Sequence, residues 1–132
     1  MGSREIAEHL AVEASAYMDL VGILQKETRD LVERDYKALY DTVDSKQQVV
    51  GRIEALGKKR AALIADGARD LSIDGEANLS AIIARLNGPQ REELARLQET
   101  ILALVESVSE INSLNTLVVK GSLENIGKTL GF

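Results

Sequence analysis

Residues 32–64 read VERDYKALYDTVDSKQQVVGRIEALGKKRAALI, and one seam of this stretch recurs at alternating steps of four and three residues. The seam comprises Val32, Tyr36, Leu39, Val43, Lys46, Val50, Ile53, Gly57, Arg60 and Ile64. A second seam of this spacing comprises Leu94, Leu97, Ile101, Leu104, Val108, Ile111, Asn115, Val118 and Ser122. A repeat of ~3.5 residues is typical of helices that pack nearly parallel, with knobs in holes. We therefore expect an all-α fold, a long antiparallel helical hairpin or bundle with coiled-coil-like packing, in which the two seams face each other.

The composition favours one helical domain over residues 1–132, with 45% hydrophobic and 28% charged residues. Aromatic residues make up only 3%, which fits aliphatic helix packing. The net charge of −5 argues against nucleic acid and anionic membranes as partners, and the absence of Cys excludes disulfides. No stretch resembles a signal peptide or a membrane helix, so we expect a cytoplasmic protein without membrane insertion. Residues 1–3 read MGS, as expression tags often do, and we leave them out of the fold prediction.

Helical spacing and capping signals divide the chain into three expected helices. The first runs from near Arg4 to about Ala65, with a bend or break left open at one of the glycines Gly22, Gly51 and Gly57. Residues 66–75 have loop composition, and a short connecting helix follows at about residues 76–86. Asn87-Gly88 is a C-cap signal, and Pro89 begins a last helix that runs toward Leu130. The long first helix exceeds the last in length, so a second subunit, as in a homodimer, is one way to cover the remainder.

Catalytic and metal-binding residues are scarce. His9 is the sole histidine, and Glu5 and Glu13 lie four residues to either side of it on one helix face. One interpretation is a carboxylate–histidine–carboxylate metal face, and the other is a solvated stripe near the N-terminus. Because the chain has no second His and no Cys, it offers no obvious pair of a catalytic nucleophile and an adjacent base. We expect a protein that is not an enzyme and has no cofactor.

Four polar residues interrupt the apolar seams: Lys46, Arg60, Asn115 and Ser122. Charged seam residues often pair with a carboxylate and fix the register of the helices. We expect Lys46 and Arg60 to lie within salt-bridge reach of acidic side chains on a neighbouring helix. Exposed pairs contribute little stability, so the change Arg60→Leu should leave the melting temperature little altered or raised, while making the register or oligomeric state less unique. The alternative is that the seams turn toward solvent at these positions.

Residues 114–132 are the strongest indication of function that the residues themselves give. The seam shifts there to Val119, Leu123, Ile126 and Leu130, while Gly121, Gly127 and Gly131 weaken the helix. An apolar helix with little intrinsic stability is typical of a segment that packs on a helical partner. We predict that the partner contacts are Leu114, Leu117, Val118, Leu123, Ile126 and Leu130. The alternative is an ordinary terminal helix buried in the hairpin or in a dimer.

Two stretches resemble the FlgN family of flagellar type III export chaperones. Residues 23–64 read ILQKETRDLVERDYKALYDTVDSKQQVVGRIEALGKKRAALI, with matching positions at Glu27, Asp35, Leu39, Lys46, Leu56, Arg60 and Leu63. Residues 111–130 read INSLNTLVVKGSLENIGKTL and resemble the closing helix of the family at Asn112, Asn115, Leu117, Ser122, Leu123 and Ile126. The glycine content of this tail departs from the family pattern.

The resemblance implies a cytoplasmic chaperone for the hook–filament junction (hook-associated) proteins. Such chaperones bind the C-terminal helices of their clients, prevent premature assembly, and deliver the clients to the flagellar export gate without hydrolysing ATP themselves. It also implies that the C-terminal helix carries much of the client contact. Two other functions stay open: a structural coiled-coil or scaffold protein acting by self-association, and a metal carrier or enzyme using Glu5, His9 and Glu13.

Overall fold

The computed structural model describes the backbone of residues 2–129 and the side chains of residues 2–121. Its four helices are α1 (Gly2–Glu33), α2 (Tyr36–Asp70), α3 (Leu79–Arg85) and α4 (Gly88–Thr129). The structure is 90% helical, and residues 2–129 contain no strand. The prediction of an all-α fold with long packed helices and one short connecting helix is therefore confirmed.

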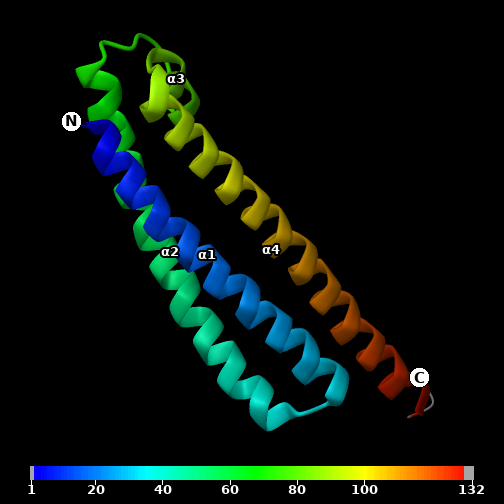
Figure 1. Cartoon of the computed structure of the whole chain (residues 1–132). Coiled ribbons are helices and arrows are strands. Elements are labelled where there is room, and N and C mark those ends of the chain that lie inside the picture. Colours follow the sequence, from blue (N-terminus) through cyan, green and yellow to red (C-terminus); the bar gives the residue numbers. More distant parts are fainter. Residues whose placement is uncertain (1, 130–132) are drawn as a thin grey trace.

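Helix α1 lies in the middle of the structure and packs against both α2 and α4 (Figure 1). Helix α2 runs antiparallel to α1, whereas α4 runs in the same direction as α1. Within the described residues the backbones of α2 and α4 do not approach each other, and α3 bridges them at one end. The expectation that the seam at residues 32–64 faces the seam at residues 94–122 is therefore wrong. Both flanking helices pack on α1 instead, and Val32 and Tyr36 are 65% and 62% exposed.

The expected first helix is not continuous, because the chain reverses at Arg34 and Asp35. Arg34 adopts a left-handed backbone conformation, with φ of 56°. The Asp35 N–H donates to the Asp30 carbonyl at 2.9 Å, and the Asp35 side chain accepts from the Ala38 N–H at 3.1 Å. Asp35 thus caps the start of α2 and satisfies one of its unpaired N–H groups. The break lies at a polar cap rather than at one of the three glycines considered, all of which lie inside helices.

The connection between α2 and α4 begins later than the sequence indicated. Helix α2 continues to Asp70, so the loop covers residues 71–78 instead of 66–75. Asn78 caps α3 by accepting from the Ala81 N–H at 2.8 Å, and the helix begins at Leu79 rather than near residue 76. The predicted break at residues 87–89 is confirmed, since α3 ends at Arg85 and α4 begins at Gly88, whose φ is 62°.

The apolar core lies at the end of the molecule where all four helices meet. Its buried members are Ile6, Ala7, Leu10, Ala14, Ile64, Ile82, Ile83, Leu94 and Ile101. Toward the turn between α1 and α2, buried polar side chains replace apolar ones, among them Glu27, Thr42 and Asn115. Buried polar groups contribute along the whole bundle, since His9 and Glu13 are also buried, while the main apolar cluster lies where the four helices meet.

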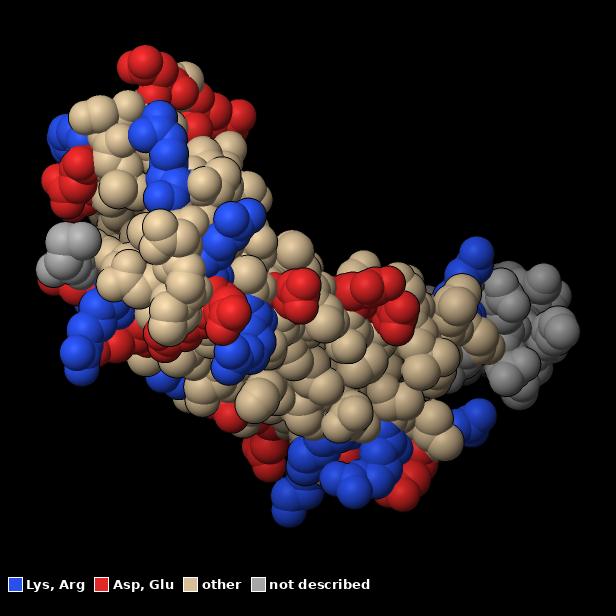
Figure 2. Space-filling view, turned by 45° about the horizontal axis from the view of Figure 1, so that its top comes forward, with Lys and Arg blue, Asp and Glu red and all other residues tan. Residues whose placement is uncertain are grey.

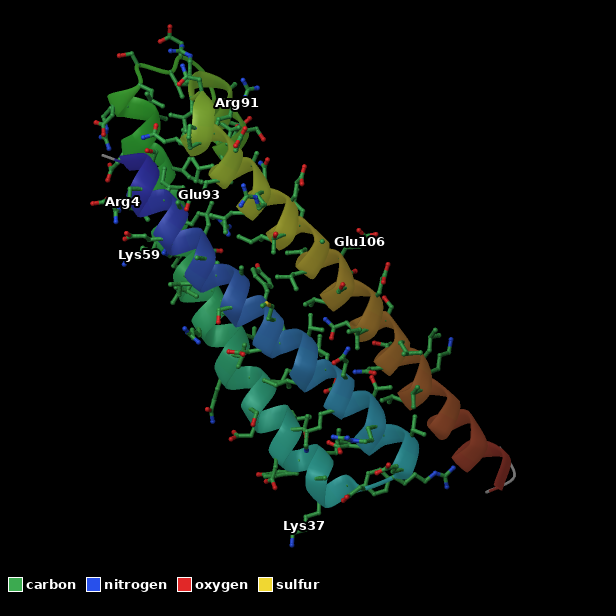
Figure 3. All side chains as sticks on the ribbon, viewed as in Figure 1. Arg4, Lys37, Lys59, Arg91, Glu93 and Glu106 are labelled. Atoms are coloured by element: carbon green, nitrogen blue, oxygen red, sulfur yellow. The ribbon has the colours of Figure 1, made fainter. Side chains whose placement is uncertain are left out.

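Charged and uncharged side chains are distributed unevenly on one face of the molecule. On the face seen in Figure 2, uncharged residues cover much of the middle, and acidic and basic groups border them. Lys37 on α2 and Glu106 on α4 point outward, away from α1 (Figure 3). On this face the acidic and basic groups therefore lie mostly around an uncharged area.

Candidate functional site: a groove between α2 and α4

Two of the polar seam residues form ion pairs between α1 and α2. The Lys46 Nζ lies 3.0 Å from Glu27 Oε2, and the Arg60 Nη1 lies 2.5 Å from Glu13 Oε2. Both carboxylates are buried, whereas the side chains of Lys46 and Arg60 are 30% and 36% exposed. The ion pairs expected from the seams are therefore present. That they fix the register of the helices stays a prediction.

Asn115 connects all three long helices at one buried point. Its Nδ2 donates to Glu27 Oε1 at 2.8 Å and to the Leu24 carbonyl at 3.2 Å, both on α1. The Thr28 hydroxyl lies 2.5 Å from Asn115 Oδ1. Because Glu27 also accepts from Lys46, a continuous set of polar contacts runs from α4 through α1 to α2. A buried amide at a seam position restricts the neighbouring helices to the registers that satisfy it.

A second polar cluster lies nearer the turn between α1 and α2. The Thr42 hydroxyl lies 2.6 Å from Asp30 Oδ2, and Asp30 is buried. Lys26 Nζ lies 2.8 Å from the Thr42 hydroxyl and 3.6 Å from Asp30. These contacts tie the last turn of α1 to the first turns of α2, next to the chain reversal.

His9 is buried between α1 and α2, contrary to the interpretation as a solvated stripe. Its Nε2 lies 2.8 Å from the Leu56 carbonyl and 2.9 Å from Glu13 Oε1. The geometry favours the carbonyl as acceptor, and Glu13 Oε1 has no hydrogen bond in the structure. Glu5 is exposed, and the described residues contain no group of three His, Asp or Glu side chains arranged to hold a metal. Glu13 instead acts as the ion-pair partner of Arg60.

Two hollows lie in line between α2 and α4, with α1 as their floor, and we call them together the groove. The first hollow has a volume of about 510 Å³ and the second about 320 Å³. The first is lined by Leu10, Tyr17, Arg60, Ala61, Ile64, Ala77, Asn78, Leu79, Ser80, Gln98, Ile101, Leu102 and Val105. The second is lined by Glu27, Leu31, Leu39, Val43, Lys46, Asn112, Asn115, Thr116 and Val119. Each hollow has room for several aliphatic side chains and carries one cation at its edge.

Some of the predicted contact residues on α4 lie away from the groove, and others lie outside the described residues. Leu114 and Leu117 are 49% and 64% exposed, and Val118 is half-buried. Residues two apart on a helix differ by about 200°, so Leu117 lies nearly opposite Val119, which lines the groove. Leu114 and Leu117 therefore lie on another side of α4 than the groove. The side chains of Ser122, Leu123 and Ile126, and all of Leu130, lie outside the described residues.

Of the groove residues of α4, Ile101, Asn115 and Val119 belong to the predicted seams, but none of the exposed groove residues was predicted as a partner contact. Leu102, Val105 and Val119 are 62%, 40% and 42% exposed and line the two hollows. A signal for them exists, because a flank of α4 also follows steps of four and three. It comprises Gln98, Leu102, Val105, Ser109, Asn112, Thr116 and Val119. The partly apolar character of this flank marks it as a second face for packing.

Comparison with known proteins gives one result that covers the whole chain. The family model described as FlgN protein matches residues 1–132. No curated protein and no solved structure matches the chain significantly. Among the described helices, none has an apolar stretch long enough to cross a membrane. The match over the full length shows that this chain belongs to the FlgN family, the chaperones of flagellar protein export.

Proposed function

We propose that this chaperone binds the C-terminal helices of hook–filament junction proteins in the groove between α2 and α4. It thereby prevents their premature assembly and delivers them to the flagellar type III export apparatus. The observation that carries the proposal is the groove itself, an open and largely apolar channel along a bundle of three long helices. We also propose that the protein acts in the cytoplasm by binding alone, without a catalytic step or a cofactor.

The arrangement of the helices supports a helical ligand. Helices α2 and α4 flank α1 without packing on each other, so the described bundle lacks a fourth long helix opposite α1. Exposed apolar side chains on a groove wall are typical of a surface that packs on another protein. An amphipathic helix places its anchors at spacings of three, four and seven residues, which match the groove wall of α4. A client helix would complete a four-helix arrangement.

The C-terminal residues Leu114, Leu117, Val118, Leu123, Ile126 and Leu130 remain a proposed second part of the client surface. Leu114 and Leu117 lie on another side of α4, so a single helix in the groove does not reach them. Leu114 and Leu117 can therefore be altered separately from the groove. We assign the larger share of the binding energy to the groove, because residues of three helices surround a ligand there.

The test compares three double variants of the full chain for binding to C-terminal segments of junction proteins by calorimetry. Leu102→Ser with Val105→Ser alters the groove, and Leu114→Ser with Leu117→Ser is the matched change on the other side of α4. Both pairs are at least 40% exposed, so neither change should impair folding. Leu123→Ala with Ile126→Ala alters the proposed C-terminal contacts. Circular dichroism checks the helix content of each variant.

We expect the groove variant to weaken binding by about a hundredfold, since each apolar anchor contributes roughly 1–3 kcal/mol. The Leu114 and Leu117 variant should weaken binding by less than about fivefold. Loss of binding in that variant alone would transfer the client site to the other side of α4. If junction-protein segments do not bind the unmodified chain, and sedimentation shows only self-association, the structural coiled-coil function replaces the chaperone proposal.

A further inference from the structure

The residues of α4 that line the two hollows recur at a spacing of two heptads. On α4 the first hollow is lined by Gln98, Ile101, Leu102 and Val105. The second is lined by Asn112, Asn115, Thr116 and Val119, each two heptads further along the helix. Two heptads correspond to about 21 Å along a helix and return to nearly the same face. The groove wall of α4 therefore presents the same helix positions twice, although Asn115 and Thr116 of the second hollow stand where the first has Ile101 and Leu102.

The opposite wall repeats with the same spacing. Glu13 on α1 pairs with Arg60 on α2, and Glu27 pairs with Lys46. Glu27 comes two heptads after Glu13, and Lys46 comes two heptads before Arg60, as two antiparallel helices require. In each repeat a buried carboxylate on α1 holds a partly exposed cation of α2 at the edge of a hollow.

Both cations retain hydrogen-bond donors that the chain does not use. Among the hydrogen bonds of the described residues, Arg60 donates to Glu13 alone and Lys46 to Glu27 alone. A guanidinium has five N–H donors and an ammonium three, so each head keeps at least one for a ligand. Arg60 and Lys46 are also the basic residues among those that line the hollows. A carboxylate on the ligand would match these donors in both charge and geometry.

We propose that the groove recognises an amphipathic helix with two carboxylates two heptads apart, each beside an apolar anchor that enters a hollow. One carboxylate pairs with Arg60 and the other with Lys46. The inference rests on the proposed function in taking the ligand to be a client helix. It adds the register of that helix, because a shift by one heptad removes both ion pairs while leaving the apolar contacts in phase. The pairs thus select the register, and the anchors supply most of the affinity.

Synthetic peptides of about four heptads test the spacing directly against the full chain. All carry Leu at the same heptad positions and a terminal fluorophore. In the first peptide two Glu side chains lie two heptads apart, in the second they lie three positions closer together, and in the third two Gln side chains lie two heptads apart. Dissociation constants are measured by fluorescence anisotropy at constant ionic strength. We expect the first peptide to bind about threefold more tightly than the second, which can still form one ion pair, and about tenfold more tightly than the third, which forms none.

Two double variants assign the preference to the cations. The changes Glu13→Gln with Arg60→Met, and Glu27→Gln with Lys46→Met, remove both partners of a pair and so leave no buried charge unpaired. Each should reduce the preference for the first peptide over the third to about threefold, and their combination should abolish it while the Leu-driven binding persists. Circular dichroism identifies a variant that fails to fold. In that case the three peptides, measured on the unmodified chain, still show whether the spacing of the carboxylates matters.

Three outcomes would overturn the inference: none of the peptides binds, the Glu and Gln peptides bind within twofold of each other, or the preference survives in the combined variant. Peptides that do not discriminate, together with junction-protein segments that bind, would leave the chaperone function standing and remove the register rule. Peptides that discriminate, together with junction-protein segments that fail to bind, would keep the rule and assign the groove to other clients.

Discussion

Replacing Arg60 by Leu should destabilise the protein substantially, in contrast to the expectation from the sequence. That expectation assumed an exposed ion pair, but the partner carboxylate of Glu13 is only 1% exposed. Removing one partner of a buried pair typically costs about 3–5 kcal/mol, because the other charge stays buried without compensation. The Arg60 side chain is 36% exposed, so water can reach part of the vacated space. We therefore expect a loss of about 2–3 kcal/mol in the free energy of unfolding.

The assay is urea unfolding followed by circular dichroism, with thermal melting as a second probe. For a domain of this size the loss corresponds to a fall in Tm of roughly 10 °C. The matched control is Lys58→Leu, an exposed cation of the same helix, which should change stability by less than about 0.5 kcal/mol. The double variant Glu13→Leu with Arg60→Leu should recover most of the loss, since an apolar pair replaces both charges. An Arg60→Leu protein as stable as the Lys58→Leu control would refute the reasoning.

Four further changes test the packing and capping described above, each by urea unfolding. Gly51→Ala should stabilise the chain by about 1 kcal/mol, because nothing lies within 4 Å of the added Cβ. Gly67→Ala should gain nothing, because its Cβ would lie 3.2 Å and 3.3 Å from isoleucine methyl groups of α1 and α3, and equal gains would contradict this packing. Asp35→Ala should cost about 1 kcal/mol through loss of the cap, and an unchanged midpoint would mean that the cap is dispensable. Asn115→Leu should cost about 1–3 kcal/mol by leaving polar groups of α1 unpaired, whereas the exposed neighbour Asn112→Leu should not.

The sequence predicted the elements better than their arrangement. Heptad spacing indicated the helical class, and the Asn87-Gly88-Pro89 signal placed the boundary between α3 and α4 to within two residues. The reversal at Arg34 and Asp35 was missed because a polar pair in a polar helix looks the same whether it continues the helix or caps the next one. The chain reverses because Arg34 adopts a left-handed backbone conformation. Arginine has no preference for that conformation, so the sequence does not indicate the turn.

The candidate site was predicted in its polar contacts but not in its position. Lys46 and Arg60 break an apolar seam, so a search for carboxylate partners followed directly from the sequence. Their partners Glu13 and Glu27 were not identified, because a Glu on an amphipathic helix is usually solvated and only the tertiary packing buries it. The groove was missed for a related reason. An apolar seam indicates that one face of a helix is covered, but it does not indicate which helix covers that face.

The position of α1 between α2 and α4 has a consequence for the order in which the chain folds. Helices α1 and α2 are joined by a two-residue turn, so the contacts beside the turn, such as Thr42 with Asp30, close short loops and the hairpin can extend from them. The contact between Thr28 and Asn115 spans 87 residues, and closing so long a loop costs considerably more chain entropy. We expect the α1–α2 hairpin to form in the folding transition state, with α4 docking afterwards. During synthesis, α1 and α2 can therefore pack together as soon as residues 2–70 have left the ribosome. The side of α1 that packs against α4 stays uncovered until the last third of the sequence has been made.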